Sequence, residues 1–89
     1  MRAARRLYSL SLAPITAAQL RAARALLGWS ARELADQCGV SHSAISRAER
    51  AKGTPHMQPR KLSAIRAVLE KHGIEFLAAN GVRLLPNLE

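Results

Sequence analysis

The sequence predicts an all-α fold, a bundle of four to five short helices, followed by a small C-terminal β-hairpin. Three observations predict it. The 89 residues suffice for one domain with one modest core. Hydrophobic residues make up 48% of the chain but aromatic residues only 3%, so the core must consist of leucine, isoleucine, valine and alanine, a composition that favours packed helices. Helix-capping residues precede successive apolar stripes, and a single Asn-Gly pair near the end predicts a tight turn between two strands.

Residues 1–13 form the first unit, which we expect to be a tail or a short strand. Apolar residues alternate with serines from Tyr8 to Leu12, which is a weak strand pattern. The segment is also rich in arginine and free of acidic residues, so an organellar transit peptide is an alternative interpretation. Pro14 ends the segment, and the helical domain is expected over residues 14–72.

The first helix is predicted over residues 17–27. Thr16 can cap its start, and Gln19 three residues later completes a capping box, in which each side chain bonds the backbone N–H of the other residue. Gly28 is expected to end the helix. The inward face of this helix carries Leu20, Ala23, Arg24 and Leu27.

Two shorter helices are predicted over residues 31–38 and 42–50. Ser30 begins a capping box for the earlier helix, and Ser41 is expected to cap the later one. Gly39 lies between the helices, where we expect a left-handed backbone conformation that other residues tolerate poorly.

A fourth helix is predicted to start near Pro59, because proline suits a first helical turn, and to end at Gly73. Its apolar stripe consists of Leu62, Ile65 and Leu69.

Residues 73–89 are predicted to form the hairpin. Apolar runs at 74–77 and 82–85 flank Asn80 and Gly81, both of which accept positive φ. An isolated two-stranded ribbon is marginal in water. We therefore expect one face to pack on the fourth helix, and the other face or an exposed edge to contact a second copy of the chain as a dimerisation element.

The charge of the chain indicates a polyanionic partner. Fourteen basic residues oppose six acidic ones, giving a net charge of +8. Such an excess commonly binds phosphate backbones, because neutralised phosphates release condensed counterions. The single cysteine, Cys38, excludes an internal disulfide and fits the reducing cytoplasm. No apolar run approaches the length of a membrane span, so no membrane partner is expected.

Residues 31–50 have the pattern of a helix-turn-helix. Two helices that cross steeply at a short turn need a small residue where they touch, which Ala35 supplies, and a turn residue free to take positive φ, which Gly39 supplies. The wedge between the helices would be filled by Leu34, Val40 and Ile45.

Residues 16–49, reading TAAQLRAARALLGWSARELADQCGVSHSAISRAE, resemble the Xre family of lambda-repressor-like (Cro/CI-type) helix-turn-helix proteins. The resemblance extends over about residues 15–69. It implies a lambda-repressor-like bundle and a homodimer that binds double-stranded DNA at a palindromic operator. It further implies a transcriptional repressor or dual regulator of bacteria or phage, located in the cytoplasm on the nucleoid.

The resemblance also implies roles for individual residues. The helix over 42–50 is the recognition helix, and its first turn enters the major groove. His42, Ser43 and Arg47 are expected to contact base edges, and an arginine can bind guanine with two hydrogen bonds. The expected contacts to the DNA backbone come from Ser30, Arg32, Ser41, Ser46, Arg50 and Lys52.

Two further positions follow from the resemblance. The family often has glutamine at the position of Ala31, where it anchors phosphate, so that contact is missing in this chain and Arg32 is the candidate to replace it. In related proteins an ion pair joins the first and third helices at the positions of Arg24 and Glu49, and we expect the same structural pair here.

Other chemistry lacks support in the sequence. His56, His72 and Cys38 do not have the spacing of a metal site, so neither metal nor cofactor is expected. No paired carboxylates or catalytic triad are evident, so an enzyme is not expected. Cys38 is expected to act as a small apolar residue, with a redox switch as the alternative. Trp29 is expected to be half-buried packing, with a base-stacking platform as the alternative.

Two other functions remain open at this point. The chain could be an antitoxin that neutralises a toxin through its hairpin and also binds its own promoter. It could instead be an architectural DNA-binding protein with little sequence preference. A regulator that activates transcription would also contact RNA polymerase.

Overall fold

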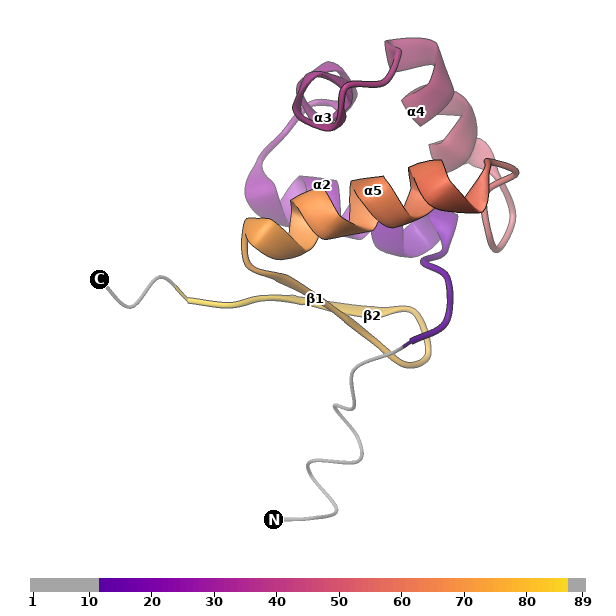
Figure 1. Ribbon diagram of the computed structural model, residues 1–89. Helices are drawn as coiled ribbons and strands as arrows, with labels where there is room; N and C mark the ends of the chain where they lie inside the picture. Colours follow the sequence, from indigo (N-terminus) through magenta and orange to yellow (C-terminus); the bar gives the residue numbers. More distant parts are fainter. Residues whose placement is uncertain (1–11, 87–89) are drawn as a thin grey trace.

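The computed structural model describes residues 12–86, and within them it contains four helices and one two-stranded sheet (Figure 1). These are α2 (Ala17–Leu27), α3 (Ala31–Cys38), α4 (His42–Arg50), α5 (Pro59–Lys71), β1 (Ile74–Leu77) and β2 (Gly81–Leu84). The predicted fold class is confirmed, and the helices lie at the predicted positions. The tail, strand or transit peptide expected near the start falls almost entirely outside the described residues. No helix within 12–86 is long and apolar enough to cross a membrane.

Local capping explains where the first three of these helices begin. Thr16 and Gln19 form the predicted capping box, with Thr16 Oγ1 accepting from Gln19 N–H at 3.1 Å and Gln19 Oε1 accepting from Thr16 N–H at 3.0 Å. Ser30 begins a second capping box, and Ser41 Oγ accepts from the N–H of Ala44 at 3.1 Å. By contrast, α5 begins with a proline in its first turn and has no side-chain cap.

The elements form three layers (Figure 1). The two short helices α3 and α4 lie on one side, α2 and α5 form the middle, and the hairpin lies on the far side of α2 and α5. The core between the layers is aliphatic except for one phenylalanine, as the composition predicted. Its fully buried side chains include Ile15, Leu20, Leu34, Ile45, Ile65, Leu69, Ile74 and Phe76.

The hairpin is present, but its turn differs from the prediction. The strands pair antiparallel with Leu77 opposite Gly81. The residues with positive φ are Ala79 at 58° and Asn80 at 63°, one position earlier than expected, and Gly81 belongs to β2. Gly81 is needed for space instead: a Cβ there would lie 3.0 Å from Leu77 Cβ and 3.2 Å from the carbonyl oxygen of Ala78.

One buried amide ties this hairpin to α2. Gln19 is 4% exposed, and its Nε2 donates to the carbonyl oxygens of Leu77 at 2.9 Å and Gly81 at 3.0 Å. Thr16 Oγ1 adds a 2.6 Å hydrogen bond to Asn80 Oδ1. The hairpin therefore packs on α2 as well as on α5, where only the latter contact was predicted.

Candidate nucleic-acid interface

The turn between α3 and α4 fixes the angle between these two helices. Gly39 has φ 68° and ψ 31°, in the left-handed region, and the N–H of Val40 bonds the carbonyl oxygen of Ala35 at 3.1 Å. Ala35 is 2% exposed, and Leu34 and Ile45 are fully buried between the helices. These residues have the places that the sequence pattern predicted, so α4 is held rigidly against the core by one of its faces.

The opposite face of α4 is open to solvent. His42, Ser43 and Arg47 are all exposed. Ser43 Oγ lies 3.3 Å from Ser41 Oγ, whereas the side chains of His42 and Arg47 form no hydrogen bond or ion pair with any residue from 12 to 86. The structure thus leaves the three expected base-contacting residues exposed on α4, which lies on the side of the molecule away from the hairpin (Figure 1).

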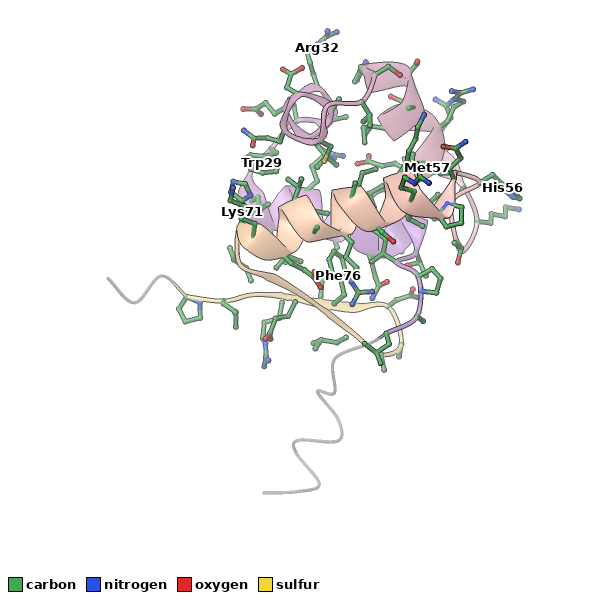
Figure 2. All side chains as sticks on the ribbon, viewed as in Figure 1. Trp29, Arg32, His56, Met57, Lys71 and Phe76 are labelled. Carbon is green, nitrogen blue, oxygen red and sulfur yellow. The ribbon has the colours of Figure 1, made fainter. Side chains whose placement is uncertain are left out.

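The residues expected to contact the DNA backbone surround this surface. Arg50 and Lys52 are exposed at the end of α4 and just after it, and Ser46 is half-buried on its flank. Arg32 projects from the outer side of α3 (Figure 2). The neighbouring Ala31, where the family often has glutamine, packs partly buried against the core and offers no polar group.

Ser30 and Ser41 already act as helix caps, which limits how they can bind phosphate. Ser30 Oγ accepts from the N–H of Glu33 at 3.0 Å, and Glu33 Oε1 accepts from the N–H of Ser30 at 2.7 Å. A capping serine keeps its hydroxyl hydrogen for donation to a ligand. The carboxylate of Glu33, however, brings a negative charge to the start of α3 that opposes a phosphate there.

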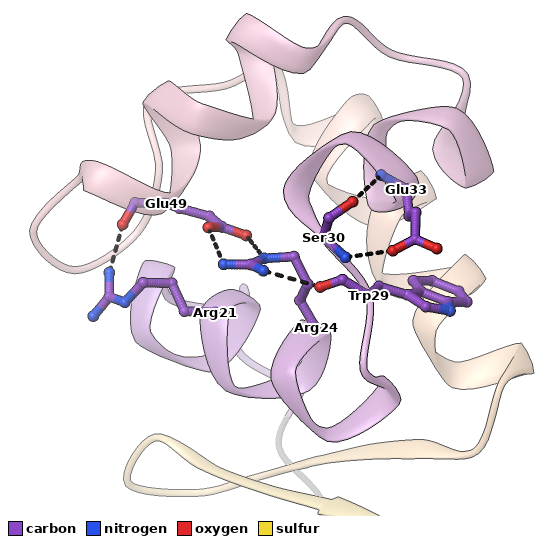
Figure 3. Close-up of polar contacts among 6 residues, drawn as sticks. All are labelled: Arg21, Arg24, Trp29, Ser30, Glu33 and Glu49. Carbon is purple, nitrogen blue, oxygen red and sulfur yellow. Dashed lines mark hydrogen bonds and ion pairs between the residues drawn. The ribbon is translucent and has the colours of Figure 1, made fainter.

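An ion pair joins α2 to α4 (Figure 3). Arg24 Nε lies 2.7 Å from Glu49 Oε2, and Arg24 Nη2 lies 3.0 Å from Glu49 Oε1. Arg24 Nη1 also donates to the carbonyl oxygen of Trp29 at 2.9 Å. The hydrogen bond with Glu49 raises the pKa of Arg24, although partial burial acts in the opposite direction. The expected partners are therefore bonded through two parallel contacts, a strong and directional arrangement.

A second arginine of α2 reaches the same residue, which the sequence analysis missed. Arg21 Nη1 donates to the backbone carbonyl oxygen of Glu49 (Figure 3). A cation at the carboxyl end of a helix can bond a carbonyl oxygen that has no partner within the helix. Its positive charge is also stabilised by the negative end of the helix dipole. The sequence did contain a signal for this contact, because Arg21 lies one helical turn before Arg24 and therefore on the same side of the helix. Glu49 is thus held by α2 at both its side chain and its backbone.

Trp29 and Cys38 both pack against other parts of the protein. Trp29 is half-buried, and its ring meets that of His72 edge-on with centroids 4.8 Å apart. Cys38 is also half-buried, and burial raises the pKa of its thiol to about 11. Within residues 12–86, no three His, Cys, Asp or Glu side chains are grouped so that they could hold a metal ion.

Comparison with known protein families gives a match to the central part of the chain. Residues 20–71 match a family described as helix-turn-helix, of the Cro/CI type, over more than half of the chain. The matched segment starts within α2 and ends with α5, so it contains the α3–α4 pair and leaves the hairpin outside. No curated protein and no solved structure gives a significant match.

Proposed function

The chain belongs to the Xre-like, Cro/CI-type helix-turn-helix family of DNA-binding regulators, and on that basis we propose that it represses or dually regulates transcription from a palindromic operator, bound as a homodimer. It would act in the cytoplasm of a bacterium or on a phage genome, at the nucleoid. We propose no catalytic role and no cofactor for it.

The asymmetry of α4 is the observation that carries this proposal. One face of the helix is buried through Ile45, Ala48 and Glu49, while the exposed side chains of His42 and Arg47 form no hydrogen bond or ion pair with a described residue. An exposed, rigid and basic helix face fits the major groove, which is wide enough to admit one α-helix. Rigidity matters because contacts to base edges depend on fixed geometry.

Within this proposal the residues divide by the part of DNA that they touch. Arg47, with His42 and Ser43, would read base edges and set the sequence preference. Arg50 and Lys52, with Ser46, Ser41, Ser30 and Arg32, would contact the backbone, which positions the protein but carries little sequence information.

The hairpin supports the homodimer. Leu84 at the end of β2 is 37% exposed, and Leu85 directly after it is 43% exposed. The sheet has only two strands within the described residues, and an edge strand can pair with a further strand. A second copy joined there would leave both recognition helices free, because the hairpin lies across the molecule from α4 (Figure 1). Residues 73–89 would then be the dimerisation element beside the DNA-binding domain of residues 14–72.

Selection of binding sites from a random DNA pool tests the proposal. We expect enrichment of an inverted repeat whose half-site centres lie about one helical turn, roughly 34–36 Å, apart. Arg47→Ala should relax the preference at one base pair per half-site, whereas Lys52→Ala should weaken binding to all sequences alike. A pool that shows no preferred sequence would instead support an architectural DNA-binding protein and would contradict the proposal.

The exposed leucines also favour a second candidate function, that of an antitoxin. In that case Leu84 and Leu85 would contact a toxin instead of a second copy. Sedimentation of the purified protein separates the two possibilities, since a homodimer has twice the chain mass. A monomer that becomes a stable complex only with the product of a neighbouring gene would favour the antitoxin. A dual regulator would additionally bind RNA polymerase, which a pull-down on operator DNA would detect.

A further inference from the structure

An apolar hollow lies where the start of the described chain meets α5. Its walls come from three segments, residues 12–15, residues 54–57 and the first half of α5. Most of the side chains that line it are aliphatic or proline, and Met57, next to the first turn of α5, is one of them (Figure 2). The volume is about 220 Å³, compared with roughly 150 Å³ for an engineered protein cavity that binds benzene. The hollow is therefore large enough to hold one aliphatic side chain.

The walls of the hollow are held in place by the fold. The side chain of Arg66 on α5 ties down the first wall, because its Nη1 donates to the carbonyl oxygen of Ala13 at 2.9 Å. The loop after α4 is tied to the start of α2, where the N–H of Ala17 bonds the carbonyl oxygen of Gly53 at 2.8 Å. Three of the lining residues have φ fixed by their rings, namely Pro14, Pro55 and Pro59. A hollow with such walls can bind an apolar group with little loss of conformational entropy.

An exposed leucine lies at the edge of the hollow. Leu12 lines the hollow but is 97% exposed, more than any other large apolar side chain of residues 12–86. Removing apolar surface from water is favourable, so both the leucine and the hollow beside it would gain from a cover. Within residues 12–86 nothing covers Leu12. Leu12 and the hollow thus form one continuous apolar surface.

The segment that directly precedes Leu12 has side chains suited to this surface. Residues 1–11 lie outside the described part of the chain, and their sequence contains Leu7, Tyr8 and Leu10. Successive side chains of an extended segment point to opposite sides, so Tyr8 and Leu10 would share the side of Leu12, whereas Leu7 would not. Leu10 is at most about 7 Å from Leu12 along the chain. A tethered segment is also present at a high effective concentration, which favours it over a free ligand.

We propose that the hollow is the docking site of the chain's own N-terminal segment, with the Leu10 side chain inside it and the Tyr8 ring against Met57. Methionine sulfur contacts aromatic rings favourably. Docking would also cover Leu12 and brace the loop that follows α4. The inference gives residues 1–11 a role that the proposed function does not, and it does not depend on DNA binding.

Nuclear magnetic resonance of the full chain, labelled at the methionine methyl groups, tests the proposal. The chain has two methionines, so the signal of Met57 is the one that Met57→Leu removes. It has a single tyrosine, so the ring signals of Tyr8 are equally unambiguous. In the unchanged protein we expect cross-relaxation between the ring protons of Tyr8 and the methyl group of Met57.

Leu7 and Leu10 provide a matched pair of variants. Leu10→Ser and Leu7→Ser make the same chemical change at positions that face opposite sides of an extended segment. We expect Leu10→Ser to abolish the cross-relaxation and to shift the Met57 methyl signal, and Leu7→Ser to preserve both. Circular dichroism of the two variants would show that the helices are retained.

The outcomes separate the possible occupants of the hollow. Cross-relaxation that is absent from the unchanged protein, or that both variants lose equally, would overturn the proposal. Cross-relaxation that disappears on dilution would assign the hollow to the segment of a second copy and would also overturn it. Operator selection is a separate measurement, so failure of the docking site and failure of the proposed function are distinguishable.

Discussion

The ion pair between α2 and α4 gives a quantitative prediction. Glu49→Ala removes a carboxylate that is held by Arg24 through bonds of 2.7 and 3.0 Å. The side chain of Glu49 is 10% exposed and that of Arg24 is 25% exposed. Removing one partner of a buried pair costs about 3–5 kcal/mol, whereas exposed pairs contribute about 0.2–1 kcal/mol. The geometry here lies nearer the buried limit.

The two single substitutions should differ in size. After Glu49→Ala, the guanidinium keeps its bond to the Trp29 carbonyl and is partly reached by water, so we expect a loss of about 2–3 kcal/mol. Arg24→Ala leaves a nearly buried carboxylate without its partner and also frees that carbonyl, so we expect about 3–4 kcal/mol. The double substitution should lower the free energy of unfolding by clearly less than the sum of the two single losses. The reason is that the second substitution removes a charge that the first had already left without its partner.

Urea unfolding followed by circular dichroism and by the fluorescence of Trp29, the single tryptophan, measures these losses. With a slope of roughly 1 kcal/mol per molar urea, Glu49→Ala should lower the midpoint by about 2 M or more. Glu70→Ala is the control, since Arg66 Nε meets Glu70 Oε2 at 3.0 Å but Glu70 is 47% exposed, and we expect less than about 1 kcal/mol. If Glu49→Ala costs no more than Glu70→Ala, the reasoning from burial is wrong.

Three further predictions follow from other parts of the structure. Gly39→Ala should cost about 1–2 kcal/mol in chemical unfolding, from backbone strain alone, because φ is 68° and no atom lies within 4 Å of an added Cβ. Gln19→Leu should leave the carbonyl oxygens of Leu77 and Gly81 without their donor, so amide exchange in the hairpin should accelerate more than in α4; equal acceleration would contradict this role. Cys38 has a pKa of about 11, so the folded protein binds its proton more tightly than the unfolded chain; stability should fall between about pH 9 and 11, and thiol labelling at pH 8 should be slow until urea unfolds the protein.

The elements that depend on neighbours in sequence were predicted well. Thr16, Ser30 and Ser41 bond backbone groups only three residues away, and Gly28 and Gly39 end their helices in left-handed conformations. Each such interaction is complete within one helical turn. The boundaries of α2, α3 and α4 could therefore be predicted from the sequence without knowledge of the tertiary structure.

Features that need distant parts of the chain were missed or misplaced. The sequence shows Gln19 as a capping residue, but its second role depends on carbonyls 58 and 62 residues away. The requirement for Gly81 comes from the side chain across the hairpin and not from its own φ. In the candidate site, the exposed face of α4 follows from helical periodicity, whereas the hydrogen bond from Arg21 to the backbone of Glu49 depends on how α2 meets α4. No local pattern encodes that meeting.

The layered arrangement has a consequence for how such a protein can diversify. The residues proposed to choose the DNA sequence project from α4 without supporting the core, and the hairpin leucines project from the opposite layer. Under the proposed function, a substitution of His42 or Arg47 would redirect the protein to a new operator without repacking Leu34 or Ile45. Mutations that alter the proposed dimer would accumulate separately in the hairpin. Target choice and oligomer choice would then be inherited as nearly independent traits on one 89-residue chain.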